Sequence, residues 1–223
     1  MKVLWRRIRM TIIDRVKQEK IIAIVRGIEP NRIIDTCEAL YAGGISMIEI
    51  TFDQSSPTGN KDTYHAIKKV ADTLGKEVCV GAGTVMTIEQ VSLAIEAGAT
   101  YIISPNFDKA VVAKTLEGGA VSMPGVMTPS EIVDAYQAGA GAVKIFPIDR
   151  LGTGYLKAVK SPISHIPIIA VGGIDLDNAS DYIKAGAIGL GIGSSLVDKQ
   201  LIQAGKYDAL TQRAKAFVHK VQM

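Results

Sequence analysis

The sequence of 223 residues has no apolar run approaching the roughly 18 residues that a membrane-spanning helix needs, so we expect no membrane span. Its two cysteines, Cys37 and Cys79, form no Cys-x-x-Cys pair, which argues against a disulfide-stabilised secreted domain and fits a reducing cytoplasm. The three histidines, His65, His165 and His219, do not have the spacing of metal ligands. We therefore expect no metal and no other cofactor.

The chain also has little excess of either positive or negative charge. The net charge is +3 at pH 7, and four basic residues lie within the first nine positions, so residues 10–223 carry −1, which is +3 less those four. A nucleic-acid-binding surface would need a clear basic excess, so we expect no nucleic-acid partner. The basic start has neither an uninterrupted apolar stretch nor a small-residue cleavage site, which argues against a signal peptide and favours a cytoplasmic location.

Short apolar runs alternate with stretches of helical spacing along the whole chain. Several helical stretches end in a glycine, as in Ala97-Gly98-Ala99, where a helix end needs a left-handed residue. Helix starts are indicated by Thr128, followed by Pro129 and Glu131, and by Asp175 and Asp177. Eight apolar runs begin near Ile21, Met47, Val78, Tyr101, Val121, Ala142, Pro167 and Ile188.

Eight strand-helix units without a Pro-, Gly- or Ser-rich linker predict an α/β protein with a closed parallel (β/α)₈ TIM barrel. We expect a single domain over residues 1–223, with an N-terminal arm and helix over 1–19 and the barrel over 20–223. The amphipathic stretch from about Ile12 to Glu19 is expected to cover the bottom of the barrel. The rival fold, an open doubly wound sheet, usually has a glycine-rich nucleotide loop after its first strand, and Arg26-Gly27-Ile28-Glu29-Pro30 is not one.

Lys144 is the most informative residue, because it interrupts the apolar run Ala142-Val143-Lys144-Ile145-Phe146-Pro147. The two-residue period of a strand places Val143 and Ile145 on one face and Lys144 on the other. A lysine in partly dry surroundings tends to lose its proton, and a neutral amine attacks carbonyl carbon. The residue is therefore a candidate Schiff-base lysine. The alternatives are a structural ion pair and a lysine whose amine reaches solvent at the strand end.

Other polar residues gather at the carboxyl ends of the expected strands, where TIM barrels carry their active sites. Arg26 ends the first strand, and Glu49 faces the interior from the second. Two successive glycine-rich strand ends, Gly172-Gly173 and Gly193-Ser194, match a backbone-amide phosphate site. Each residue type has a plainer interpretation: Glu49 could neutralise Lys144, Arg26 could be an ordinary surface residue, and the glycines could close tight turns.

In combination, these motifs resemble the pyruvate-forming class I aldolases that cleave 2-keto-3-deoxy-6-phosphogluconate (KDPG) and 4-hydroxy-2-oxoglutarate (KHG). The resemblance runs from about Ile21 to the C-terminus. The matching motifs are Glu49-Ile50-Thr51, Gly81-Ala82-Gly83-Thr84-Val85, Ile103-Ser104-Pro105, Met123-Pro124-Gly125, Lys144-Ile145-Phe146-Pro147, Gly172-Gly173-Ile174 and Gly191-Ile192-Gly193-Ser194.

The resemblance implies a lyase in which Lys144 forms the Schiff base and Glu49 is the acid/base acting through a bound water. It also implies a small 2-oxo-3-deoxy acid phosphate as substrate and a homotrimer. The remaining implied site residues are Arg26 and Thr84 for the carboxylate, Gly172, Gly173, Gly193 and Ser194 for the phosphate, and Pro105, Phe146 and Val171 as pocket lining.

The chain departs from the phosphogluconate pattern at two places. Asp53 stands where many members have an arginine, so carboxylate binding falls to Arg26. Ala170-Val171 stands where many have Pro-Thr, whose hydroxyl can contact the substrate's C4 hydroxyl. The string Ala170-Val171-Gly172-Gly173 and the motif Ser104-Pro105-Asn106 resemble the phosphogalactonate-cleaving branch, whereas Thr51-Phe52 resembles the phosphogluconate branch. The stereochemical preference therefore stays open, and dual specificity is one of the alternatives. Two other classes stay open as well: a phosphosugar isomerase or epimerase with Glu49 as base, and a non-catalytic phosphosugar-binding barrel.

Overall fold

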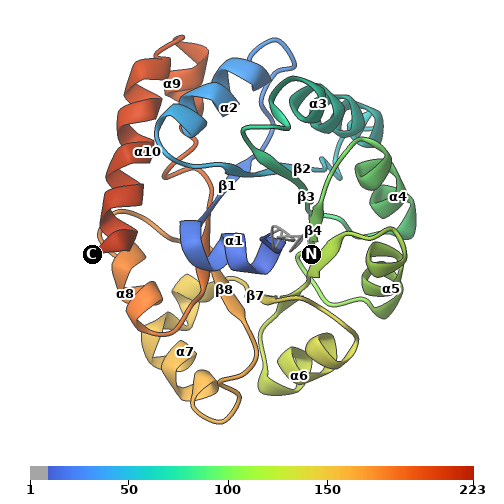
Figure 1. Ribbon diagram of the computed structural model, residues 1–223, viewed down its shortest axis with the longest axis vertical. Coiled ribbons are helices and arrows are strands. Elements are labelled where there is room, and N and C mark those ends of the chain that lie inside the picture. Colours follow the sequence, from blue (N-terminus) through green and yellow to red (C-terminus); the bar gives the residue numbers. More distant parts are fainter. Residues whose placement is uncertain (1–9) are drawn as a thin grey trace, which may run out of the picture.

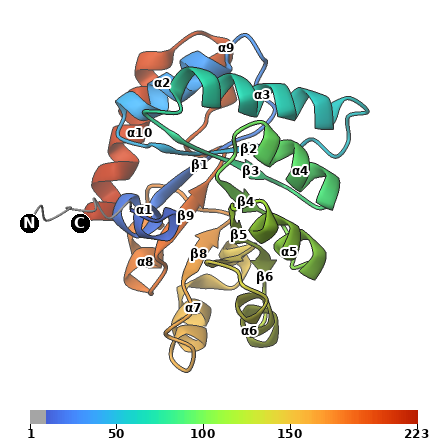
Figure 2. The same cartoon turned by 45° about the vertical axis from the view of Figure 1, so that its right-hand side comes forward.

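The computed structural model describes residues 10–223, so the arm predicted over residues 1–9 lies outside the described residues. Its strands form one sheet in the order β5-β4-β3-β2-β1-β9-β8-β7-β6, in which all neighbouring pairs are parallel. Helices surround the strands on the outside in both ribbon views (Figures 1 and 2). The predicted α/β barrel with an extra N-terminal helix is confirmed.

The elements follow one another as strand and helix from β1 onward. The strands are β1 (Ile21–Val25), β2 (Met47–Thr51), β3 (Cys79–Gly83), β4 (Tyr101–Ile103), β5 (Val121–Met123), β6 (Gly125–Val126), β7 (Val143–Ile145), β8 (Ile168–Val171) and β9 (Gly189–Ile192). The helices are α1 (Ile12–Glu19), α2 (Ile33–Ala42), α3 (Gly59–Leu74), α4 (Ile88–Glu96), α5 (Lys109–Glu117), α6 (Pro129–Gln137), the 3₁₀ turn η1 (Ile148–Arg150), α7 (Gly152–Lys160), α8 (Ala179–Lys184), α9 (Lys199–Gln203) and α10 (Tyr207–Gln222).

The fifth expected strand is two short strands, β5 and β6, separated by Pro124. Strand β5 pairs with β4, and β6 pairs with β7, so the two halves face different neighbours and together complete the ring. Proline has no N–H to donate to a ladder, which breaks the strand at this residue. Gly125 then passes so close to Pro105 that a Cβ there would lie 2.2 Å from the Pro105 carbonyl oxygen.

Strand alternation divides the apolar side chains between two cores. Ile48 and Ile50 of β2, and Phe52 directly after it, pack outward against the helices, whereas Met47 packs inside the barrel with Tyr101. Each of these large side chains is almost fully buried, and such burial stabilises the fold by about 1.5–3 kcal/mol per residue. The predicted faces of β2 and β7 are therefore correct, and Lys144 points inward.

Local signals at the helix ends behave as predicted with one exception. Thr128 caps α6 in a full capping box with Glu131. The helix expected to start at Asp175 or Asp177 begins instead at Ala179, because the Asp175 carboxylate accepts the N–H groups of Asp177 and Asn178 and forms a turn. Left-handed glycines follow the helices at Gly44, Gly98, Gly119, Gly139 and Gly186.

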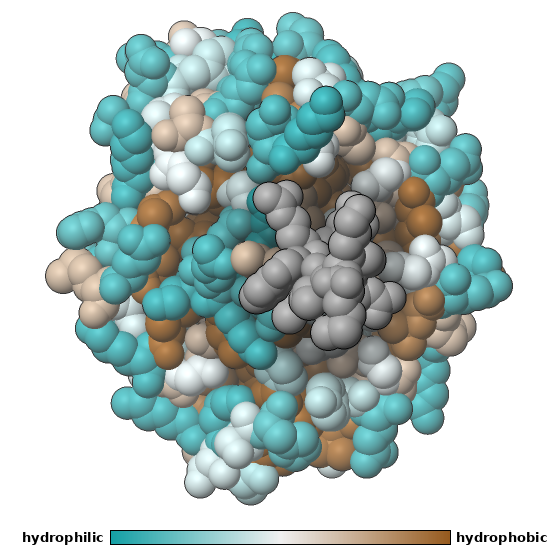
Figure 3. Space-filling model, in the orientation of Figure 1, coloured by the Kyte–Doolittle hydropathy of each residue, from teal (hydrophilic) through white to brown (hydrophobic). Residues whose placement is uncertain are grey.

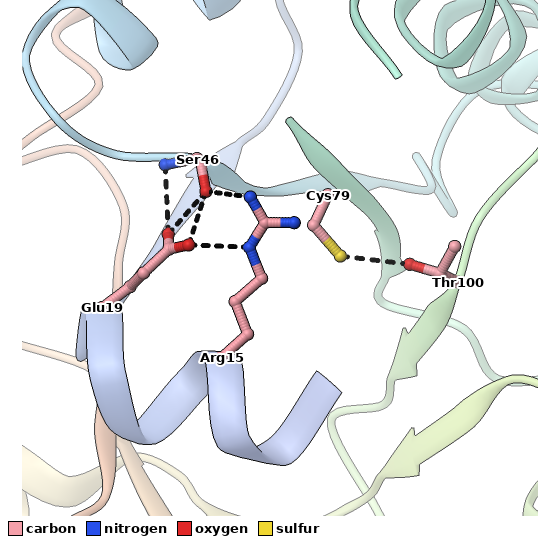
Figure 4. Close-up of polar contacts among 5 residues, drawn as sticks. All are labelled: Arg15, Glu19, Ser46, Cys79 and Thr100. Atoms are coloured by element: carbon pink, nitrogen blue, oxygen red, sulfur yellow. Dashed lines mark hydrogen bonds and ion pairs between the residues drawn. The ribbon is translucent and has the colours of Figure 1, made fainter. Parts of the chain in front are cut away.

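Helix α1 covers the end of the barrel where the strands begin. Val16 is fully buried against Gly189, where a Cβ would lie 2.6 Å from the Val16 Cγ1. Arg15 donates to Glu19 at 2.7 Å and to the Ser46 hydroxyl at 2.6 Å, and that hydroxyl donates to Glu19 (Figure 4). This network ties α1 to the loop before β2, so the opposite end is left for ligands.

Hydrophilic side chains dominate the rim of the face that carries α1, with apolar residues visible between them (Figure 3). Among the described residues, no helix has the length and apolar character that crossing a bilayer would require.

Candidate active site

A cavity of about 950 Å³ opens at the carboxyl ends of the strands. The lining residues are supplied mainly by the ends of β1, β7, β8 and β9 and by the loops that follow β8 and β9. Ten of the eleven predicted site residues line it: Arg26, Thr84, Pro105, Lys144, Phe146, Val171, Gly172, Gly173, Gly193 and Ser194. The eleventh, Glu49, is buried inside the barrel on the interior face of β2.

Lys144 extends from β7 into the interior and is only 5% exposed. Its Nζ lies 4.8 Å from the centroid of the Phe146 ring. Within residues 10–223, no carboxylate lies within 4.0 Å of this amine, so a direct ion pair with Glu49 is not formed. Burial lowers the pKa of Lys144, Glu49 opposes this shift, and the positive charge of Arg26 adds to it. The amine is thus biased toward its neutral, nucleophilic form.

Glu49 is 1% exposed, and its carboxylate occupies the space beside Gly83 on the neighbouring strand. A Cβ at Gly83 would lie 1.8 Å from Glu49 Oε1, so only glycine leaves room for the carboxylate in this position. Burial raises the pKa of Glu49, while Lys144 and Arg26 lower it. A carboxyl whose pKa is shifted toward neutrality can both accept and return a proton during a reaction.

Arg26 and Thr84 meet across the end of β2. The Arg26 Nη2 donates to the Thr84 hydroxyl at 3.3 Å, and both residues line the cavity. Thr84 has a φ of 54°, a left-handed conformation that costs a non-glycine residue about 1–3 kcal/mol. The guanidinium keeps further N–H donors in a planar fork, which suits a carboxylate.

The glycines after β8 and β9 expose backbone to the cavity. Gly172 and Gly173 have φ values of 103° and 65°, and a Cβ at Gly193 would have no atom within 4 Å. Strands β8 and β9 are neighbours, so the two turns stand side by side. Such open backbone can approach an anion closely, which a side chain would prevent.

Sequence reasoning missed Lys199, which also lines the cavity from the first position of α9. The strand pattern gave no signal for it, because it follows a loop and not a strand. The described residues contain no group of three or more His, Cys, Asp or Glu side chains that could hold a metal ion.

The family described as "Aldolase: KDPG and KHG aldolase" matches residues 12–213. The chain is 34% identical over 200 residues to the 2-dehydro-3-deoxy-6-phosphogalactonate aldolase of Escherichia coli (strain K12), covering 89% of this chain and 92% of that protein. It is 32% identical over 205 residues to the 2-dehydro-3-deoxy-phosphogluconate aldolase of Treponema pallidum (strain Nichols), covering 91% and 93%.

Among solved structures, the fold matches KDPG aldolase from Legionella pneumophila, captured with pyruvate as a covalent carbinolamine intermediate. The TM-score is 0.82 at 26% identity, over 92% of this chain and 96% of that one. Sequence and fold similarity therefore both extend over most of the chain, with 89% and 91% of it covered by the two relatives and 92% by the solved structure. The chain belongs to the KDPG and KHG aldolase family.

Proposed function

We propose that this protein is a class I aldolase that reversibly cleaves 2-dehydro-3-deoxy-6-phosphogluconate to pyruvate and D-glyceraldehyde 3-phosphate. The observation that carries the proposal is the buried Lys144 amine, which faces the cavity without a carboxylate within 4.0 Å among the described residues. Burying a lysine without a partner costs the fold stability, and a catalytic role would explain why this chain has one. Family membership supports the same reaction class.

In the proposed mechanism, Arg26 and Thr84 bind the substrate carboxylate and so hold the C2 ketone against Lys144. The neutral amine adds to C2 to give a carbinolamine, which loses water to form an iminium. The glycine turns at Gly172-Gly173 and Gly193-Ser194 bind the phosphate at the other end of the substrate. Pro105, Phe146 and Val171 complete the walls.

Glu49 then accepts the proton of the C4 hydroxyl, the C3–C4 bond breaks, and the electrons of that bond move into the iminium to give an enamine. The aldehyde product leaves. Protonated Glu49 returns its proton to C3, and water hydrolyses the iminium to release pyruvate and free Lys144. The same steps would split 4-hydroxy-2-oxoglutarate into pyruvate and glyoxylate.

Borohydride reduction in the presence of pyruvate tests the proposal. We expect covalent addition at Lys144, detected by mass spectrometry, and loss of both the adduct and turnover in Lys144→Met. Lys160 offers a matched control, because burial also lowers its pKa but its amine donates to the carbonyls of Ser164 and Ile166. Lys160→Met should keep the adduct.

The same measurements distinguish the other classes. An isomerase or epimerase that uses Glu49 as base would keep its turnover in Lys144→Met and would form no adduct. A non-catalytic binding barrel would bind phosphosugars and yield no pyruvate in an assay coupled to lactate dehydrogenase. Either result would refute the aldolase proposal.

A second candidate substrate is 2-dehydro-3-deoxy-6-phosphogalactonate, which differs only in the C4 stereocentre. Val171 favours it, because this buried apolar side chain lines the cavity at the position where a hydroxyl would contact C4–OH of the gluconate isomer. Comparing kcat/KM for both isomers decides between them. Val171→Thr should move the ratio toward the gluconate isomer by about tenfold, the effect of one good hydrogen bond.

The proposed chemistry needs no metal or organic cofactor, since the iminium is itself the electron sink. Activity should therefore survive dialysis against EDTA, and full loss with recovery on adding a divalent ion would contradict this. We place the reaction in the cytoplasm, where thiols stay reduced, in keeping with the free, buried Cys37 and Cys79.

We also propose a homotrimer. Three large apolar side chains near the carboxyl ends of β3 and β6 are between 40% and 54% exposed, which is unfavourable unless another chain covers them. They are Met86, Ile88 and Met127. Sedimentation equilibrium should give three times the 23.7 kDa chain mass, and Ile88→Glu with Met127→Glu should shift it toward the monomer.

A further inference from the structure

Lys199 reaches from the loop after β9 to the end of β1. It is the first residue of α9, it lines the cavity, and its side chain is exposed. A Cβ built on Gly27 would lie 3.0 Å from the Lys199 Nζ, so the amine rests against the backbone that follows Arg26. Strands β1 and β9 are neighbours. The amine therefore stands at the cavity rim, over the two strand ends that carry Arg26 and Ser194.

The charge of Lys199 has no close partner among residues 10–223, because no carboxylate there lies within 4.0 Å of its amine. The two acids that line the same cavity are already engaged. Asp198 accepts the N–H groups of Gln200 and Leu201 and pairs with Arg213 at 2.9 Å. Asp175 accepts the N–H groups of the turn that follows it. Asp53 lies near enough for Lys199 to contribute to lowering the pKa of its carboxyl, but that carboxylate already accepts the N–H and the hydroxyl of Ser55. The cavity rim thus holds a positive charge without a direct ion pair.

Helix stability does not explain this lysine. A cation in the first turn of a helix faces the positive end of the helix dipole, which is unfavourable by about 0.3–1 kcal/mol. The chain repeats the arrangement once at the same end of the barrel: Asp108 caps α5 by accepting two N–H groups, and Lys109 is the first helical residue. Lys109 does not line the cavity. The two lysines therefore share their local structure and differ in access to the ligand.

We propose that Lys199 binds the phosphate of the substrate and makes the site selective for phosphorylated over neutral 2-oxo-3-deoxy acids. This inference rests on the proposed aldolase function. The glycine turns offer backbone N–H groups but no full positive charge, whereas a phosphate ester carries about −1.5 to −2 at pH 7. The other two cations of the cavity lining, Arg26 and Lys144, act at the carboxylate and the ketone. Lys199 is left to neutralise the far end of the ligand.

A lysine also suits the geometry. Its four-carbon stem is flexible and carries a point charge, so the amine can leave its resting place beside Gly27 and follow the phosphate into the glycine turns. A charge-assisted hydrogen bond of this kind corresponds to about a tenfold to hundredfold change in affinity. Because the phosphate takes no part in bond breaking, the change should lie in KM and not in kcat.

The test compares the variants Lys199→Gln, Lys199→Arg and Lys109→Gln on two substrates, 2-dehydro-3-deoxy-6-phosphogluconate and its unphosphorylated acid. For Lys199→Gln, we expect KM to rise at least tenfold on the phosphorylated substrate, with kcat within threefold of wild type and no change on the neutral acid. Lys199→Arg should restore most of the affinity. Lys109→Gln should match wild type on both substrates. Inorganic phosphate should inhibit Lys199→Gln more weakly than wild type.

Two results would overturn the inference. One is an unchanged KM for the phosphorylated substrate in Lys199→Gln, and the other is an equal loss on both substrates, which would indicate a structural role. These failures leave wild-type turnover intact and so differ from failure of the proposed function, in which wild type releases no pyruvate. In that case, calorimetric titration with inorganic phosphate still tests the site, and equal affinity in wild type and Lys199→Gln would refute it.

Discussion

Replacing Gly83 with alanine should displace the Glu49 carboxylate, the proposed acid/base group, while Glu49 itself stays unchanged in sequence. The new Cβ would lie 1.8 Å from Glu49 Oε1, and ordinary contact begins near 3.4 Å, so the carboxylate must move by about 1.6 Å. The neighbouring Cδ and Cγ, at 2.5 and 2.6 Å, must move as well. A displacement of about 1 Å at a reacting group can lower the rate about a hundredfold. Overpacking of this kind also costs about 1–3 kcal/mol of stability.

The assay follows pyruvate release by coupling to lactate dehydrogenase, beside borohydride trapping with pyruvate. We expect kcat of Gly83→Ala to fall about a hundredfold, while the covalent adduct still forms, because Lys144 extends from β7 and not from β2 or β3. Gly154→Ala is the control, since a Cβ there has no atom within 4 Å. If kcat of Gly83→Ala stayed within threefold of wild type, the position of Glu49 could not limit the proton transfer.

The double variant Glu49→Gln with Lys144→Met removes two buried ionisable groups, so its free energy of unfolding in urea should be about 1–4 kcal/mol higher than that of wild type. A lower free energy of unfolding would refute the idea that burying these two groups is costly. Folding lowers the pKa of Lys144 below its ordinary 10.5, so the unfolded chain binds more protons just below pH 10.5 and wild-type stability should rise with pH there. Lys144→Met should lose that part of the slope, measured by urea titrations at several pH values. Thr128→Ala should cost about 1 kcal/mol through loss of the α6 cap, with kcat unchanged.

The spacing of apolar residues and the glycine and capping residues at helix ends suffice to predict most of the barrel. The expected strand starts lie within one residue of those in the structure, because each strand is buried on both sides and reads as a short apolar run. The apolar spacing predicts a single fifth strand, whereas the structure has two on either side of Pro124, and the pairing of these two strands with different neighbours depends on closure of the whole ring. Closure is a tertiary effect that no window of sequence contains.

The candidate site divides in the same way. Residues held by strands, such as Lys144 and Glu49, could be placed from alternation alone, since the strand decides which way the side chain points. Lys199 could not, because it follows an irregular loop and its long side chain crosses to Gly27 in a different part of the sequence. The direction of a side chain can thus be predicted from sequence where the strand backbone fixes it. It cannot be predicted where a long, flexible side chain can take several directions, as at Lys199.

The two interior glycines of β3, Gly81 and Gly83, serve both the packing of the barrel and the position of its acid/base residue. The missing side chain of Gly81 leaves space for the Tyr101 ring from β4, and that of Gly83 leaves space for the Glu49 carboxylate from β2. The fully buried ring fills the interior layer of the barrel, and this dry environment is the kind that raises the pKa of Glu49 and lowers that of Lys144. A larger residue on β3 would fill the same volume but would displace the acid. The small residues of β3 therefore do more than permit packing, because they let one tightly packed interior contain two ionisable groups without a direct ion pair between them.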